Sequence, residues 1–243
     1  MRKDIEDERS INDYSFEISI RKTEIILKQL KKCVCKIYNQ KENGSGFFCK
    51  IPYKDNNEYK EIKALITCHH VLGKGKDDLI KGKKITLSFY DERNAYSIIL
   101  DDKRIVWTNI EYDITIIEIK PKDQINYECL NIHESIFSNA DINSLFINNP
   151  IYILHNPSNS TLASYGNIIE INESFIDHYS STQKGSSGGP ILSLVNNKVI
   201  GIHKGYERNE KGVNKGILIS FGINEFLKYL NNINKKKRSR KIR

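Results

Sequence analysis

The chain has 243 residues, of which 39% are hydrophobic and 28% charged, an ordinary composition for a folded soluble protein. No apolar run approaches the roughly 20 residues that span a bilayer, and the charged N-terminus, MRKDIEDERS, lacks the apolar segment of a secretion signal. The formal charge is +8, but the last nine residues, KKKRSRKIR, carry seven Lys and Arg, so the rest of the chain has a charge of only +1. This near-neutral body disfavours a large nucleic-acid-binding face.

The elements predicted in chain order are mostly short strands. Residues 1–30 are expected to form a polar arm and a short helix over Thr23–Lys32, where Ile26 and Leu30 lie four residues apart. CVCKIYN and GSGFFCKI, within residues 33–51, predict a hairpin with a Gly-Ser-Gly turn. Further strand patterns follow in the first half: EIKALITC, KKITLSF, YSIILD, RIVW and DITIIEI.

Strand patterns resume after a less regular connector at residues 126–145. They are PIYILHN, YGNIIEI, SFIDHY, PILSLV, KVIGIH and KGILIS. INEFLKYLNNI, residues 223–233, predicts a closing helix with Phe226, Leu227 and Leu230 on one side. We therefore expect an all-β fold of two six-stranded antiparallel β-barrels, residues 31–125 and 146–222, followed by a helix at 223–234 and a basic tail at 235–243.

One short stretch, QKGSSGGPIL at residues 183–192, gathers three glycines around two serines. It is either a flexible turn or the surroundings of a nucleophile, Ser187, because small residues let backbone amides and a substrate chain approach. A serine nucleophile needs a base, an orienting carboxylate and N–H donors for the developing oxyanion. The stretch also fits the G-x-S-x-G elbow of α/β-hydrolases, but those enzymes need an acid and then a His after the serine. The 56 residues after Ser187 contain no Asp and a single His, His203, only 16 positions on, so the order does not fit.

The order His, Asp, Ser has better support. ALITCHHVL, residues 64–72, predicts a strand that ends in two histidines, and YDITIIEIK, residues 112–120, places an Asp at the head of an apolar strand. TCHHVL, DITIIEI and GSSGGPIL resemble the active-site blocks of trypsin-like serine proteases with the chymotrypsin fold. GSGFF, residues 44–48, resembles the hairpin that precedes the histidine block in the branch that includes the HtrA proteases. The resemblance covers roughly residues 33–232.

The resemblance implies roles for the first two blocks. His70 is the expected base, because the family places Val or a small residue directly after the catalytic histidine, and His69 is the rival. Asp113 is expected to orient His70 and to stabilise its charged form. Asp101 and Asp102 are alternatives, although they fit a turn better. Asp113 lies 43 residues after His70 and 74 residues before the serine block's Ser187.

In the third block, the resemblance makes Ser187 the nucleophile and the amides of Gly185 and Ser187 the oxyanion hole. Secreted digestive members carry an Asp just before the nucleophile, which pairs with a new N-terminus released by cleavage. This chain has Ser186 there, so we expect an enzyme that needs no such cleavage. The odd number of cysteines, five, and the missing secretion signal favour free thiols in a reducing compartment.

The segment VIGIHKGYE, residues 199–207, raises a question of specificity. A lone histidine on an apolar strand, His203, is ordinarily a core residue. GIH after the serine block also resembles the pocket strand of the staphylococcal glutamyl endopeptidases and of the picornavirus main proteases. In those groups a Thr five residues before the nucleophile, here Thr182, joins the histidine. A pocket for Lys or Arg would need an Asp six residues before the nucleophile, where this chain has Ser181. We therefore expect cleavage after Glu or Gln.

These observations predict a cytoplasmic serine endopeptidase that acts on polypeptides, with no metal, no cofactor and no membrane association. Nuclear import and a weak nucleic-acid contact through the basic tail stay open. The alternative from another class is a binding or scaffold protein of the same fold that has lost turnover.

Overall fold

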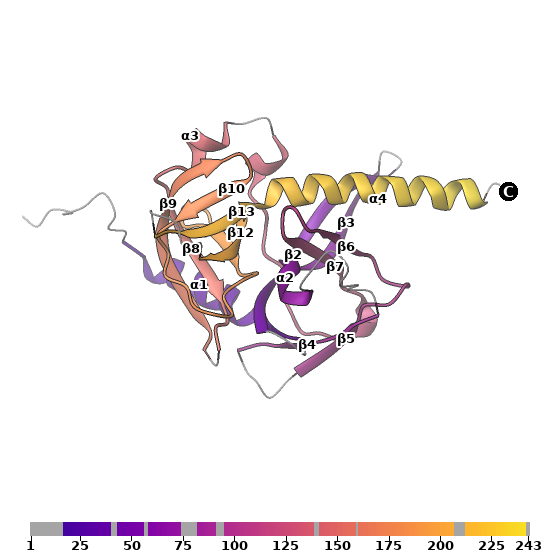
Figure 1. Cartoon of the computed structure of the whole chain (residues 1–243), viewed down its shortest axis with the longest axis horizontal. Coiled ribbons are helices and arrows are strands. Elements are labelled where there is room, and N and C mark those ends of the chain that lie inside the picture. Colours follow the sequence, from indigo (N-terminus) through magenta and orange to yellow (C-terminus); the bar gives the residue numbers. More distant parts are fainter. Residues whose placement is uncertain are drawn as a thin grey trace, which may run out of the picture.

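The computed structural model describes residues 17–39, 43–55, 58–73, 82–90, 95–138, 141–158, 160–206 and 212–241. Two antiparallel β-sheet units lie side by side, and the long C-terminal helix α4 (Ile219–Lys241), yellow in Figure 1, leaves the second unit and runs along the first. The predicted all-β class with a C-terminal helix is confirmed. Within the described residues, no helix is both long enough and apolar enough to cross a membrane.

The first unit is a sheet of seven strands in the order β5-β4-β1-β2-β3-β7-β6. Each of the seven strand patterns of the first half forms a strand, one more than the six expected for a barrel. Its strands are β1 (Val34–Tyr38), β2 (Asn43–Asp55), β3 (Glu58–Cys68), β4 (Lys84–Ser88), β5 (Ala95–Ile99), β6 (Val106–Asn109) and β7 (Ile114–Glu118). β-branched residues make up most of β7, ITIIE, whose first four residues are buried, and the second half of β3 is buried beside it. The long β2–β3 hairpin forms the middle of this sheet.

The predicted Gly-Ser-Gly turn is wrong. Gly44, Ser45 and Gly46 lie inside β2 and pair with β1, so the chain reverses between Tyr38 and Asn43 instead. A Cβ atom on Gly44 would lie 2.5 Å from the Val71 side chain, which is closer than real contacts allow. Close packing against neighbouring side chains, rather than a turn, therefore explains this glycine.

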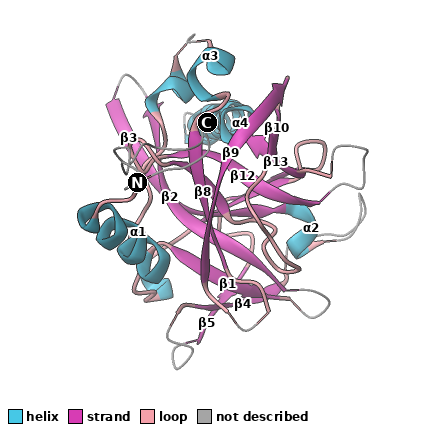
Figure 2. Ribbon diagram, turned by 90° about the vertical axis from the view of Figure 1, so that its left-hand side faces the viewer, coloured by secondary structure: helices cyan, strands magenta, loops and turns pink. Residues whose placement is uncertain are grey.

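The second unit is a closed barrel of six strands in the order β10-β13-β12-β11-β8-β9, as predicted. Its strands are β8 (Pro150–His155), β9 (Leu162–Asn172), β10 (Phe175–His178), β11 (Pro190–Ser193), β12 (Val199–Tyr206) and β13 (Asn214–Leu218). Three short helical segments connect the two units: η1 (Pro121–Asp123), η2 (Glu134–Phe137) and α3 (Ile142–Phe146). Figure 2, in which strands are magenta, shows that the body of the molecule consists mainly of strands.

Helix α1 (Ile20–Lys32) starts three residues before the predicted Thr23, because Ser19 caps it by accepting a hydrogen bond from the Lys22 amide. Ile26 and Leu30 are buried, as their spacing predicts. This helix packs against the core through these two residues, and the predicted arm before residue 17 lies outside the described residues.

Helix α4 is longer than predicted at both ends. It begins at Ile219, within a stretch that reads as a strand, because Ile219, Ile223 and Phe226 continue one buried apolar face from the end of β13. It continues through Lys241, so it takes in most of the segment expected as a separate tail. The Phe226 ring packs against Trp107 of β6, with 5.9 Å between centroids, which ties the helix to the first unit.

Candidate active site

Strands β3 and β7 bring the histidine block and its aspartate together. The two strands are antiparallel, and Cys68 pairs with Ile114. The residues that follow Cys68 and those that precede Ile114 therefore leave the sheet at the same end. The one-turn helix α2 (His69–Leu72) starts directly after β3, and Asp113 directly precedes β7.

The Asp113 carboxylate holds His70 through two hydrogen bonds. One oxygen accepts from the His70 backbone amide at 2.9 Å, and the other lies 2.7 Å from Nδ1 of the ring. An ionised carboxylate only accepts hydrogen bonds, so Nδ1 carries the proton and Nε2 is left with a free lone pair. Asp113 is buried, whereas 39% of the His70 side-chain surface is exposed.

The backbone of Asp113 adopts a left-handed conformation, with φ of 51°, which Asp tolerates better than most residues. Its carbonyl oxygen accepts a hydrogen bond from the His69 amide at 3.0 Å. The turn before β7 and the start of α2 are thus joined by three hydrogen bonds, counting the two from the carboxylate to His70. The unusual backbone angle aims the carboxylate at the helix rather than along the strand.

The rival residues point elsewhere. His69 is buried, and its Nδ1 lies 3.0 Å from the hydroxyl of Thr108 on β6. Its ring therefore faces the sheet rather than the Asp113 carboxylate. Asp101 accepts a hydrogen bond from the Lys103 amide in the turn after β5, which is the structural role that the sequence favours for it.

The serine block forms a tight turn before β11 that the first unit holds through Ser45. The Ser45 amide donates to the carbonyl of Ser187 at 2.8 Å, and the Ser45 hydroxyl donates to the carbonyl of Gly185, also at 2.8 Å. Ser45 is fully buried, so these bonds are shielded from water. The Gly-Ser-Gly stretch of β2 is therefore part of the site, a role that its sequence did not reveal.

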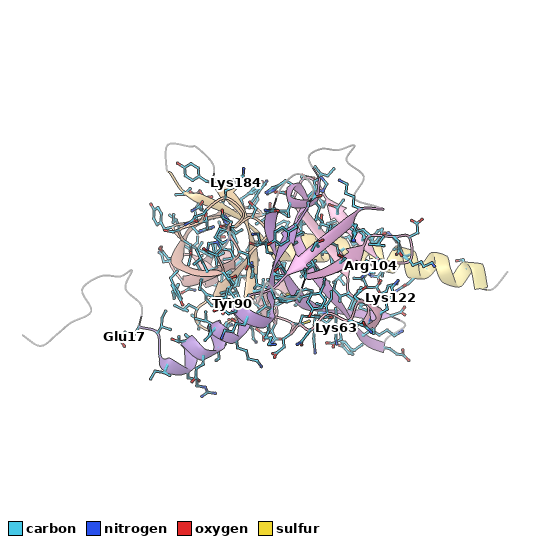
Figure 3. The ribbon with its side chains drawn as sticks, turned by 90° about the horizontal axis from the view of Figure 1, so that it is seen from below. Glu17, Lys63, Tyr90, Arg104, Lys122 and Lys184 are labelled. Atoms are coloured by element: carbon cyan, nitrogen blue, oxygen red, sulfur yellow. The ribbon has the colours of Figure 1, made fainter. Side chains whose placement is uncertain are left out.

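The turn requires a glycine at position 188, directly after Ser187. The φ of Gly188 is +88°, and a Cβ atom there would lie 2.1 Å from the Ser45 carbonyl oxygen and 3.2 Å from the Cys68 amide nitrogen. The turn thus abuts the end of β3, the strand that leads into His70. Ser187 itself is half-buried between the two units, and Lys184, exposed just before the turn, is labelled at the surface in Figure 3.

The predicted oxyanion-hole amides belong to Gly185 and Ser187. The carbonyl of Gly185 is used by Ser45, and the carbonyl of Ser186 accepts from the Gly189 amide at 3.0 Å. Within the part of the chain that is described, the amides of Gly185 and Ser187 have no hydrogen-bond acceptor. The turn therefore anchors its carbonyl groups internally and leaves two nearby N–H groups available.

The two predicted specificity residues lie on neighbouring parts of the second barrel, but the structure gives no direct contact between them. The Thr182 hydroxyl donates to the side-chain oxygen of Asn214 at 3.0 Å, and the Asn214 amide donates to the carbonyl of Ser180 at 2.8 Å. His203 is only 1% exposed, and its backbone amide donates to the carbonyl of Gly189, which ties β12 to the turn around Ser187.

His178 is a partner of His203 that the sequence reading missed. Its Nε2 lies 3.2 Å from Nδ1 of His203, and its own Nδ1 is buried without a partner among the described residues. Burial lowers the pKa of His178 to about 3. Burial, and then the proximity of His178, lowers the pKa of His203 well below its ordinary value, so both imidazoles are neutral near pH 7.

Cys68, His70 and Asp113 offer ligand atoms that lie within 4.8 Å of one another. Two of these three groups are already joined by the hydrogen bond between the His70 ring and the carboxylate. Burial raises the pKa of the Cys68 thiol well above its ordinary value, which opposes the thiolate that a metal ion needs. We assign no metal to this cluster. All five cysteines are free thiols.

Comparisons with known proteins agree with this geometry. Residues 44–202 match the trypsin-like peptidase domain, whereas a comparison with curated proteins found no match. Among solved structures, the serine endoprotease from Yersinia pestis has a TM-score of 0.59 at 14% identity, over 87% of this chain and 68% of that chain. A protease from M. tuberculosis in its active form has a TM-score of 0.57 at 16% identity, over 84% and 83% of the two chains.

A human pathogenic astrovirus serine protease has a TM-score of 0.50 at 17% identity, over 76% of this chain and 88% of that chain. At such identities these likenesses support a shared fold. The domain match, in contrast, covers more than half of the sequence and includes all three active-site blocks. The chain therefore belongs to the trypsin-like peptidase family, the serine endopeptidases that its sequence resembles.

Proposed function

We propose that the protein hydrolyses peptide bonds through a triad of Ser187, His70 and Asp113. The single observation that carries the proposal is the pair of hydrogen bonds that the Asp113 carboxylate accepts from the backbone amide and the ring of His70, at 2.9 and 2.7 Å. A carboxylate in this position fixes the imidazole tautomer that can act as a base. The ring contact of His69 with Thr108 speaks against the rival histidine.

In this mechanism the Ser187 hydroxyl attacks the substrate carbonyl carbon while its proton moves to Nε2 of His70. The carbonyl oxygen takes the negative charge and accepts hydrogen bonds from the amides of Gly185 and Ser187. His70 then gives its proton to the leaving amine as the C–N bond breaks, which leaves an acyl-enzyme. Water repeats the sequence with His70 as base, which releases the carboxylic acid and restores Ser187.

Labelling with a fluorophosphonate probe tests the nucleophile directly. The wild-type protein is expected to be labelled and Ser187→Ala is expected not to be labelled. His70→Ala is expected to lose both labelling and peptide hydrolysis, and His69→Ala, its neighbour in the chain, serves as the matched comparison. Full activity of His70→Ala together with an inactive His69→Ala would overturn the assignment of the base.

For specificity, we propose that Thr182 and His203 bind the side chain that precedes the cleaved bond, and that Gln is preferred there over Glu. His203 is neutral because burial lowers its pKa, so it offers one donor without a charge to pair with a carboxylate. The Thr182 hydroxyl donates its proton to Asn214, so it can act toward a substrate only as an acceptor. An amide side chain can satisfy a donor and an acceptor together, whereas a carboxylate only accepts.

Matched peptides with Gln, Glu, Leu or Lys before the cleaved bond test this proposal. We expect the highest kcat/KM for Gln, with a Gln-to-Leu ratio that stays constant between about pH 6 and 8, because the lowered pKa keeps His203 neutral there. His203→Ala is expected to flatten the preference while fluorophosphonate labelling is largely retained. A preference for Lys, Arg or a large apolar residue would return His203 to a purely structural role.

We also propose that the enzyme acts in a reducing compartment, as the free state of its five cysteines supports. Import into the nucleus through the basic C-terminal segment belongs to the same proposal, and localisation of a tagged chain with and without residues 235–243 tests it. Retention of nuclear signal after deletion of this segment would contradict the import role.

A further inference from the structure

A chain of polar groups centred on a buried histidine supports the turn around Ser187. His155, at the end of β8, is only 1% exposed, and its Nδ1 lies 2.6 Å from the hydroxyl oxygen of Ser186. Its other ring nitrogen, Nε2, lies 2.8 Å from the hydroxyl oxygen of Ser164 on β9. The Ser186 oxygen also accepts a hydrogen bond from the Gln183 amide at 3.0 Å. None of these groups belongs to the proposed triad.

The direction of each hydrogen bond follows from the donors available. The Gln183 amide donates to Ser186, so the hydroxyl hydrogen of Ser186 needs an acceptor of its own. Among the described residues, that acceptor is Nδ1 of His155. The proton of the neutral ring is then on Nε2, where it is donated to Ser164. Burial lowers the pKa of His155 to about 4, which keeps the ring in the neutral form that this arrangement requires.

The same end of β8 supports the turn through a second hydrogen bond. The amide of Asn156 donates to the Ser45 hydroxyl at 2.9 Å, and that hydroxyl in turn donates to the carbonyl of Gly185. His155 and Asn156 therefore hold, directly and through Ser45, the two consecutive residues Gly185 and Ser186. These residues immediately precede Ser187, and their peptide groups lie next to the N–H groups proposed to bind the oxyanion.

We propose that His155 is a positioning residue that fixes the nucleophile turn through the hydroxyl of Ser186, an inference that rests on the proposed peptidase function. His155 does not touch the substrate in this proposal. It aligns the backbone on which the oxyanion donors lie, and it does so with a partner from inside the folded chain. With this internal hydrogen bond, the turn is held in place although position 186 carries a serine instead of the Asp of the secreted enzymes.

Two substitutions of His155 separate positioning from simple packing. The side-chain oxygen of Asn lies near the position of Nδ1 in histidine, so His155→Asn can still accept from Ser186. The amide of Gln reaches only the position of Nε2, so His155→Gln keeps a donor for Ser164 and loses the bond to Ser186. We expect His155→Gln to lower kcat about tenfold with KM little changed, the effect of one lost buried hydrogen bond. Ser186→Ala also removes the bond from the Gln183 amide, so we expect it to lower kcat at least as much.

The expected order of kcat is wild type, then His155→Asn, then His155→Gln. The double variant His155→Gln with Ser186→Ala should be no worse than Ser186→Ala alone, because the bond that His155→Gln removes is already absent in that variant. His133→Gln is the matched control, since its Nδ1 also bonds a serine hydroxyl, that of Ser135 at 2.8 Å, but in the connector. It is expected to keep wild-type kcat.

Rates are referred to the concentration of active sites titrated with the fluorophosphonate probe, and Tm is measured for every variant. Equal kcat for the Asn and Gln variants, additive losses in the double variant, or losses confined to Tm would overturn the positioning role while the labelled wild type still stands as a peptidase. If Ser187 of the wild-type protein is not labelled and no peptide is cleaved, the proposed function fails, and the positioning role fails with it.

Discussion

Asp113→Asn changes one oxygen to an amide group and leaves the size of the side chain unchanged. In the wild-type protein both carboxylate oxygens accept, one from the His70 amide at 2.9 Å and one from Nδ1 at 2.7 Å. Asn has one acceptor oxygen and one donor NH₂ group, so it cannot satisfy both donors. If its oxygen keeps the backbone amide, its NH₂ group faces Nδ1.

A donor that faces Nδ1 moves the ring proton to Nε2, and the ring can then no longer accept a proton from Ser187. The opposite orientation of Asn places NH₂ against the His70 amide, a donor–donor contact inside a buried site that costs about 1–3 kcal/mol. The first orientation is therefore favoured, and we expect kcat to fall about 10⁴-fold with the fold intact, as for the same change in a triad of this kind.

Peptide hydrolysis, referred to protein that retains the wild-type Tm, measures this loss. Asp101→Asn makes the same chemical change in the turn after β5 and is expected to leave kcat within twofold of wild type. A kcat for Asp113→Asn within tenfold of wild type would refute the tautomer argument. An equal loss in Asp101→Asn would show that the effect does not come from the His70 contact.

The remaining predictions concern backbone strain, acid stability and activation. Gly188→Ala should abolish hydrolysis, since its Cβ would meet backbone 2.1 Å away, whereas Gly82→Ala, at a similar φ of +86° but in open space, should keep activity at a cost of about 1–2 kcal/mol in stability. Burial alone would raise the pKa of Asp123, but hydrogen bonds, chiefly from Arg104 (Figure 3), outweigh burial and lower it. The ionised Asp123 therefore stabilises the fold above the unfolded pKa of about 3.9, and this stabilisation is lost as pH falls through the folded pKa. Asp123→Asn should therefore reduce the free energy of unfolding by about 3 kcal/mol at pH 7, measured as a lower Tm. The difference in Tm from wild type should vanish in acid. The full-length reduced chain should be labelled by a fluorophosphonate without N-terminal cleavage, and strict dependence on a cleaved N-terminus would contradict this.

Much of the fold was predictable because strand patterns are local. Alternating or continuous β-branched segments such as DITIIEI mark strands whichever partner they acquire, and every strand of the second barrel was found this way. The Gly-Ser-Gly stretch was misread because a glycine that opens a turn and a glycine that avoids a clash look identical in sequence. The residue that requires Gly44 is Val71, which is distant in the chain and reaches it only after β3 has folded back.

The candidate site was predictable to the extent that its parts lie in local blocks. His70 and Asp113 were identified from their blocks, and the register of β3 and β7 explains why those blocks meet. His155 and His178 were read as ordinary strand residues. Their partners, Ser186 and His203, come from other strands and loops of the barrel, and no local pattern specifies that pairing.

The position of Ser187 depends on both units at once. Its carbonyl accepts from Ser45 of the first unit, while the next residue, Gly188, donates to the carbonyl of His203 in the second barrel. Asn156 of the second barrel then binds the Ser45 hydroxyl, which closes the connection between the units. The nucleophile turn is therefore a feature of the interface between the units. Each sheet could keep its own hydrogen bonds if the units separated, but the turn would lose the bonds from Ser45 that hold the carbonyls of Gly185 and Ser187.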